Sequence, residues 1–177
     1  AQIELVISNN PVAGGLAHAS KADIPHLIVS HKKFGDVAAF SEAIFSAIQA
    51  ADIDLVVMGG FLRRLTIPPA YENRVINIHP SLIPAFCGKG FYGQKVHQAV
   101  VDYGCKLSGC TVHYVDDQYD HGPIIAQETV PVETTDTANT LAMRVFEKEC
   151  ELYPAVINAI LAGNVTIKDR CVAISKP

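Results

Sequence analysis

The sequence lacks the features that would mark a membrane, fibrous or nucleic-acid-binding protein. Its longest apolar stretches, such as Leu55–Met58, are far shorter than the roughly 20 residues that a membrane-spanning helix needs. It has no internal repeat, no low-complexity tract and no recognisable secretory or transit signal. It has no excess of positive charge either, since its 14 Lys and Arg and 18 Asp and Glu give a net charge of -4. We therefore expect small-molecule partners, no nucleic acid or membrane partner, and a monomer or homodimer.

Cysteine is present but carries no pairing pattern. The five cysteines include no C-x-x-C pair, and their odd number does not suit a disulfide framework or a zinc ribbon. We interpret them as free thiols, which indicates a reducing compartment, and we expect a cytoplasmic protein. They stand at Cys87, Cys105, Cys110, Cys150 and Cys171.

The composition that remains is that of a globular domain. Hydrophobic residues make up 49% and charged residues 18% of 177 positions, enough for one sizeable core. Short apolar strands alternate with amphipathic helices, which predicts a doubly wound α/β class with a parallel sheet. The expected strands are Ile3–Ser8, His26–Val29, Leu55–Met58, Val75–His79, Thr111–Val115, Ile124–Val132, Val165–Ile167 and Cys171–Ile174, and the expected helices are 13–22, 34–51, 94–103 and 137–162. Leu55–Met58 is apolar throughout, which is typical of a strand buried on both faces.

Two polar side chains, Asn77 and His79, end the strand Val75–His79, which Pro80 closes. Because side chains alternate along a strand, both point to one face, and the two isoleucines of the strand point to the other. Ligands of open α/β sheets lie beyond the carboxyl ends of the strands. The spacing is compatible with a catalytic pair and equally with a structural pair satisfied in the core.

An acidic turn, Asp116–Pro123, separates two expected strands. It is either a solvated hairpin tip or a source of a carboxylate for His79, which would raise the proton affinity of that imidazole and fix its tautomer. Donors for a metal are also present, but no metal-binding signature accompanies them, and we expect no metal. These donors are His113, Asp116, Asp120 and His121.

Other chemistry-bearing residues give weaker signals. Ser81 lacks a G-x-S-x-G elbow, and nothing in the sequence marks Cys87 as a thiolate. Gly14-Gly15 lacks the rest of a dinucleotide fingerprint. Arg63-Arg64 is either a pair of solvated cations or a grip on a ligand carboxylate.

Taken together, these segments resemble the folate-dependent formyltransferases, from about Ile3 to Ile174. The resemblance implies a Rossmann-like doubly wound three-layer α/β/α fold, mostly parallel with antiparallel C-terminal strands. It is greatest to the members that serve de novo purine synthesis, which transfer a formyl group from 10-formyltetrahydrofolate to the amine of glycinamide ribonucleotide. The matching segments are 77–84, 60–65, 108–113, 120–125, Glu149 and Tyr153-Pro154.

The resemblance also implies residue roles. Asn77 and His79 would polarise the formyl carbonyl and stabilise the oxyanion, and Asp120 would support a protonated His79 and order a water that relays protons. Pro80, Gly88 and Glu149 would contact the glycinamide substrate. The folate pocket would be lined by Leu62, Arg63, Arg64, Leu65, Asp116, Asp117, Gln118 and Tyr119.

The sequence departs from the family pattern at its start. By the likeness, Ile3–Ser8 corresponds to the family's second strand, and no strand and phosphate-binding loop precede Ala1. We therefore expect a single domain over residues 1–177 that lacks its first βα unit and binds the phosphorylated amine poorly. The alternatives are a formyltetrahydrofolate hydrolase, a formyltransferase for another amine, and an inactive folate-binding fragment.

Overall fold

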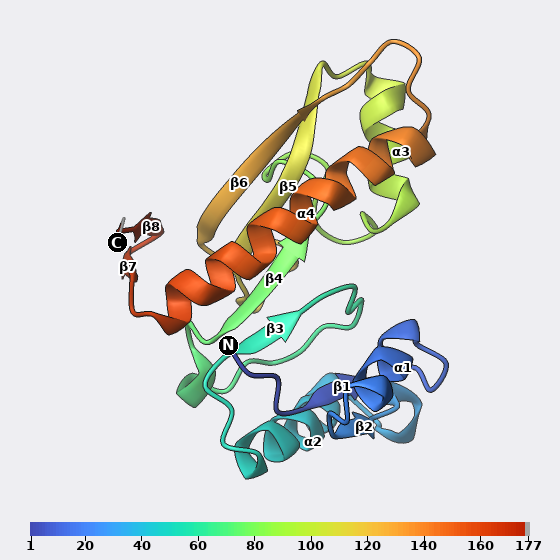
Figure 1. Cartoon of the computed structure of the whole chain (residues 1–177). Coiled ribbons are helices and arrows are strands. Elements are labelled where there is room, and N and C mark those ends of the chain that lie inside the picture. The colour runs from blue at the N-terminus through green and yellow to red at the C-terminus, as the bar shows by residue number, and fades with distance from the viewer. Residues whose placement is uncertain (176–177) are drawn as a thin grey trace.

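The secondary structure follows the predicted alternation of strands and helices. The computed structural model describes residues 1–175. In chain order, its elements are β1 (Val6–Ser8), α1 (Gly14–Lys21), β2 (His26–Ile28), α2 (Val37–Ala50), β3 (Val56–Met58), β4 (Val75–His79), α3 (Gln94–Tyr103), β5 (Leu107–Tyr114), β6 (Ile124–Pro131), α4 (Ala138–Leu161), β7 (Val165–Lys168) and β8 (Cys171–Ile174) (Figure 1). No helix of this part of the chain is both long and apolar enough to cross a bilayer.

The strands form three groups. The largest sheet has the order β3-β4-β5-β6, in which β3 and β4 are parallel, and β5 and β6 run antiparallel to their neighbours. The strands β1 and β2 form a separate parallel pair, and β7 and β8 form an antiparallel hairpin. The predicted class, an α/β fold with parallel strands first and antiparallel strands towards the C-terminus, is confirmed.

Two helices pack into separate cores, which take up alternate side chains of β4. Figure 1 shows α4 lying along β5 and β6, and α2 beside β1 and β2. Val75 packs into a cluster with Phe40 and Ile44 of α2, which also takes in residues of β1 and β3. The next residue, Ile76, packs instead into a cluster with Val156 of α4. Side chains of β4 therefore alternate between the side of α2 and the side of α4, and Asn77 points to the same side as Val75.

The ends of the helices are set by local chemistry. The Asp36 carboxylate accepts the Ala39 N–H and starts α2, and Thr137 forms a capping box with Thr140 at the start of α4. Gly104 ends α3 in the left-handed conformation that glycine adopts without strain. Further along, α4 is fastened to the sheet because the Tyr153 hydroxyl lies 2.8 Å from the Met58 carbonyl of β3.

The prediction that Leu55–Met58 is buried on both faces is wrong. Val56 and Met58 pack against the α2 cluster, but Val57 points to the opposite face and is 44% exposed. All three residues of β2 are exposed as well. One face of β3 is therefore covered by the α2 cluster and the other face is exposed, although every residue of the run is apolar.

Candidate active site

A cavity of about 950 Å³ opens where β3 and β4 end. Its walls come from the turn after β3, the end of β4, the long loop before α3, the loop that carries Asp120, and the facing sides of α3 and α4. This is the position that an open α/β sheet offers to a ligand. The polar or titratable side chains in the lining are Arg63, Asn77, His79, Lys89, Tyr92, Gln94, His97, Tyr119, Asp120, Glu149, Cys150 and Tyr153.

His79 is held between two acceptors and is only 4% exposed. Its Nε2 lies 2.9 Å from the carbonyl oxygen of Phe86, which can only accept, so Nε2 carries a proton. Its Nδ1 lies 3.5 Å from Oδ2 of Asp120. A proton on Nδ1 would therefore lie next to a carboxylate, so the ring can bind and release that proton inside the cavity.

Asn77 is positioned by a histidine on the neighbouring strand. Asn77 and His113 are directly paired between β4 and β5. Nδ1–H of His113 donates to the Tyr114 carbonyl at 2.8 Å, which leaves Nε2 to accept from the Asn77 amide nitrogen at 3.3 Å. The orientation of the Asn77 carboxamide is assigned from this bonding pattern. One N–H of Asn77 is thereby anchored, and the other is free to face the cavity.

Asp120 reaches the site from a sharply turned loop. Its backbone is left-handed, with φ of 52°, and its Oδ2 accepts the Gly88 N–H at 2.9 Å. Its Oδ1 lies 3.7 Å from Nε2 of His113. Two residues later the loop passes so close to β5 that a Cβ at Gly122 would overlap the Tyr114 carbonyl oxygen. The glycine is required there to bring the carboxylate over the end of β4.

The surroundings shift the pKa values of the three central acids and bases. Burial lowers the pKa of His79 below its usual 6.5, although the Asp120 charge and the Phe86 carbonyl oppose this. Burial alone would raise the pKa of Asp120, but the nearby His79 ring and the Gly88 N–H lower it below 3.8. Burial raises the pKa of Glu149. At neutral pH the cavity thus holds an ionised Asp120 beside a mainly neutral His79.

Residues 1–157 match the family model described as Formyl transferase. The chain belongs to the formyl transferase family. Within that family it is 36% identical over 166 residues to phosphoribosylglycinamide formyltransferase of Bacillus subtilis (strain 168), covering 93% of this chain and 83% of the relative. It is 37% identical over 169 residues to the trifunctional purine biosynthetic protein adenosine-3 of Gallus gallus, covering 94% of this chain but 16% of that protein.

Solved structures of formyl transferases share its fold. Glycinamide ribonucleotide transformylase 1 of Symbiobacterium toebii superposes with a TM-score of 0.92 and 36% identity, covering 99% of this chain and 81% of that one. The chain spans a sixth to a half of the length of the first curated relatives that it matches, the half being a chloroplastic phosphoribosylglycinamide formyltransferase of Vigna unguiculata.

The residues expected to bind folate are divided between the cavity and its surroundings. Leu62, Arg63 and Tyr119 line the cavity. Leu65 is instead buried in the α2 cluster, where it packs with Phe40. Four more residues of the expected pocket are absent from the lining and lie in the flanking segments: Arg64, Asp116, Asp117 and Gln118.

The residues expected to contact the amine substrate, Pro80, Gly88 and Glu149, all line the cavity. Pro80 and Gly88 come from the loop after β4, whereas Glu149 comes from α4 on the facing wall. Within residues 1–175, no group of three or more His, Cys, Asp or Glu side chains is arranged to hold a metal ion.

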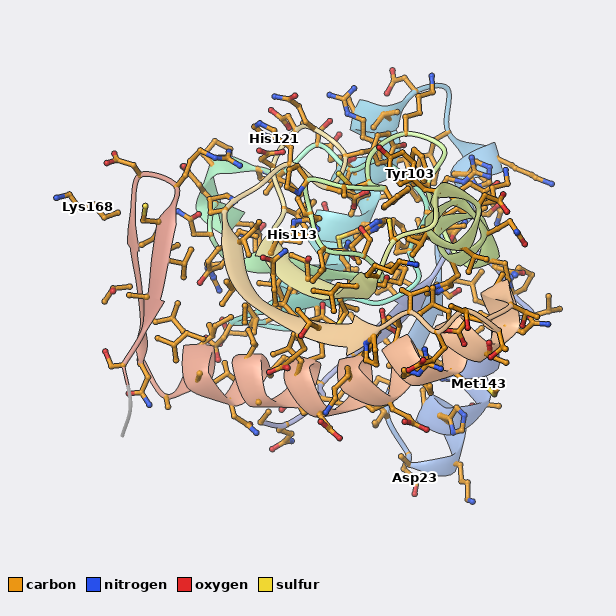
Figure 2. All side chains as sticks on the ribbon, turned by 90° about the horizontal axis from the view of Figure 1, so that it is seen from above. Asp23, Tyr103, His113, His121, Met143 and Lys168 are labelled. Atoms are coloured by element: carbon orange, nitrogen blue, oxygen red, sulfur yellow. The ribbon has the colours of Figure 1, made fainter. Side chains whose placement is uncertain are left out.

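Two histidines of the site were missed by reasoning from the sequence. His113 was weighed only as a metal donor whose side chain could face away from the acidic turn, yet it contacts both Asn77 and Asp120. Figure 2 shows His113 in the interior of the molecule, whereas His121, beside Asp120 in sequence, lies on the outer side and pairs with Asp116. The sequence does not give the register between β4 and β5, which places His113 opposite Asn77. His97, on α3, had no signal in the sequence beyond its apolar neighbours.

Proposed function

We propose that this protein transfers the formyl group of 10-formyltetrahydrofolate to the amine of glycinamide ribonucleotide. The proposal rests chiefly on one observation: Asn77, His79 and Asp120, drawn from two separate segments, converge on one cavity. It is supported by the name of the Bacillus subtilis relative, of which the chain covers 83%. An amine that attacks a formamide brings its own nucleophile, so this reaction needs no activated Ser or Cys.

Asn77 and His79 would stabilise the charge that develops on the formyl oxygen. As the substrate nitrogen bonds to the formyl carbon, the carbonyl electron pair moves to oxygen and forms an oxyanion. The free N–H of Asn77 would donate to this oxygen directly, because its other N–H is already held by His113. The His79 ring, once protonated on Nδ1, would add a positive charge stabilised by Asp120.

The His79–Asp120 pair would handle the proton. The attacking nitrogen becomes cationic in the tetrahedral intermediate and must lose a proton before the intermediate collapses. We infer that Asp120, with a water molecule completing the relay, accepts this proton and returns it to N10 of the folate as the C–N10 bond breaks. The low pKa of Asp120 keeps it in the ionised form that this role needs.

The two substrates would occupy opposite walls of the cavity. The pterin would lie against the Gly59–Arg63 turn and Tyr119, where glycines without side chains let a flat ring approach the backbone. Arg63 would face the carboxylate tail of the folate. The amine substrate would contact Pro80, Gly88 and Glu149 on the side of the loop and α4. The remaining residues of the expected folate pocket would support these walls from behind.

We further propose that the enzyme works in the cytoplasm on these small molecules. All five cysteines are free thiols, as a reducing compartment would keep them.

The decisive experiment measures consumption of 10-formyltetrahydrofolate with and without glycinamide ribonucleotide at high acceptor concentration. We expect turnover that depends on the amine, and a loss of about 10²–10⁴-fold in kcat for Asp120→Asn. The matched control is Asp102→Asn, which removes an exposed carboxylate of α3 outside the cavity lining, and it should keep the wild-type rate.

Each alternative has its own outcome in this assay. Turnover without the amine would show that the protein hydrolyses 10-formyltetrahydrofolate and does not transfer its formyl group. Donor binding without any turnover would indicate a folate-binding module. Turnover with a different amine but not with glycinamide ribonucleotide would keep the chemistry and refute the acceptor.

A further inference from the structure

A second histidine lies in the wall of the cavity with no partner. His97 belongs to α3, between the buried Val96 and the exposed Gln98, and is 5% exposed. Its Nδ1 is completely enclosed, and neither ring nitrogen makes a hydrogen bond to any group in residues 1–175. The ring itself lines the cavity that also holds His79 and Glu149. Since Nδ1 is enclosed, Nε2 is the nitrogen that can meet a bound molecule.

An unpartnered buried polar group needs an explanation, because nearly all buried polar groups in folded proteins are hydrogen-bonded. Only two other buried side-chain atoms share this condition in the described part of the chain, Nδ1 of His31 and Oγ of Ser108, and neither residue lines the cavity. Nδ1 of His97 has no acceptor beside it, so the neutral ring carries its proton on Nε2. The Nε2–H has no protein partner either, and it therefore points to an acceptor supplied by the bound substrate.

The chemistry of the wall favours the amine over the folate. His97 stands with Gln94 on α3, and Glu149 faces the same space from α4, whereas the turn proposed for the pterin lies at the end of β3. Burial lowers the pKa of His97, and the nearby His79 lowers it further. His97 is thus a neutral ring, whose Nε2–H can donate a hydrogen bond to an oxygen of the amine substrate.

We propose that His97 is a further substrate-contacting residue, whose Nε2–H donates to the carbonyl oxygen of the glycinamide and so aims the neighbouring amine at the formyl carbon. This inference rests on the proposed function. The amine loses its proton toward Asp120, and the hydrogen bond from His97 to the carbonyl oxygen is kept in the product. His97 gives up no proton during the reaction, and its role is to orient the nucleophile.

The test compares two substitutions that differ in which ring nitrogen they replace. The Gln side chain places its amide N–H near the position of Nε2, whereas Asn reaches only as far as Nδ1. We expect His97→Asn to raise KM for glycinamide ribonucleotide about tenfold, as loss of one hydrogen bond does, and His97→Gln to stay within about threefold of wild type. The Kd of the folate donor should be unchanged in both.

Ser108→Ala is the matched control, because it removes a buried unpartnered polar group outside the cavity lining, and its KM should be that of wild type. A wild-type KM in His97→Asn, or an equal loss of donor affinity, would overturn the inference and leave the proposed function standing. Absence of amine-dependent turnover in the wild type would overturn both.

Circular dichroism checks that both His97 variants fold. If they do not, crystals of the wild-type protein soaked with glycinamide ribonucleotide decide the matter. The glycinamide carbonyl oxygen within hydrogen-bonding distance of Nε2 supports the inference, and any other atom or none at that position refutes it.

Discussion

At the scale of the single residue, Asn77 shows how a carboxamide can be fixed before substrate arrives. One N–H is held by His113, so the second N–H has a defined direction and, in the reaction proposed above, would need no reorganisation when the oxyanion forms. We expect Asn77→Ala to lower kcat by about 10²–10³-fold while the Kd of the folate donor changes little. Steady-state kinetics and calorimetry measure the two quantities, with the exposed Asn158→Ala on α4 as the control.

A KM effect with unchanged kcat would contradict this role, because it would mean that Asn77 binds the ground state and the transition state equally. The residue scale also shows what sequence alone can predict. Alternation along a strand was enough to put Asn77 and His79 on one face. It was not enough to find His113 or His97, because their neighbours in space come from other elements. Only the strand register brings His113 against Asn77, and only helix packing brings His97 into the cavity wall.

At the scale of the element, the start of α4 depends on one buried carboxylate. Asp136 is 4% exposed, accepts two bonds from Arg144 at 2.7 and 3.0 Å, and also accepts the Glu133 N–H and the Thr140 hydroxyl. The hydrogen bond from Arg144 is the main reason that the pKa of Asp136 lies far below 3.8. We expect Asp136→Asn to lower the free energy of unfolding by roughly 2 kcal/mol at pH 7.

The sign of the pH dependence follows from the direction of that shift. A lowered pKa means that the stabilisation is present above the unfolded-state value of 3.8 and is lost as pH falls below it. The difference between Asp136→Asn and wild type in urea unfolding should therefore be smaller at pH 3 than at pH 7. Asp102→Asn, an exposed carboxylate with one bond to Gln98, is the control and should change little. A difference that grows at pH 3 would contradict the assignment.

Elements were predicted well where local chemistry marks their ends. β4 was predicted residue for residue because Pro80 stops it, and α3 because Gly104 caps it. β5 begins at Leu107, four residues before the predicted start at Thr111. In this added stretch Gly109 allows a close approach, since a Cβ there would overlap the Glu128 carbonyl oxygen of β6. Such contacts depend on the neighbouring strand and cannot be predicted from the local sequence alone.

At the scale of the whole molecule, the two parallel pairs differ in how they are supported. β4 lies inside the four-stranded sheet, and its Val75 and Ile76 are fully buried. The β1–β2 pair has three residues in each strand, and within residues 1–175 it shares no ladder with β3. It joins the rest of the molecule through the cluster that α2 forms with both groups of strands. The three residues proposed as catalytic, Asn77, His79 and Asp120, all lie on the larger sheet and its loops.

This arrangement predicts two levels of local stability. In native-state hydrogen exchange, the amide of Val29, bonded to Ser8, should exchange at least about tenfold faster than that of Val115, bonded to Val75, because little buried surface resists opening of β1–β2. Adding 10-formyltetrahydrofolate should slow exchange around β4 and the Asp120 loop more than in β2, since the cavity belongs to the larger sheet. Equal protection of both pairs in the free protein would instead mean that the α2 cluster couples them into one cooperative unit. Opening of the β1–β2 pair would then require unfolding of the four-stranded sheet as well.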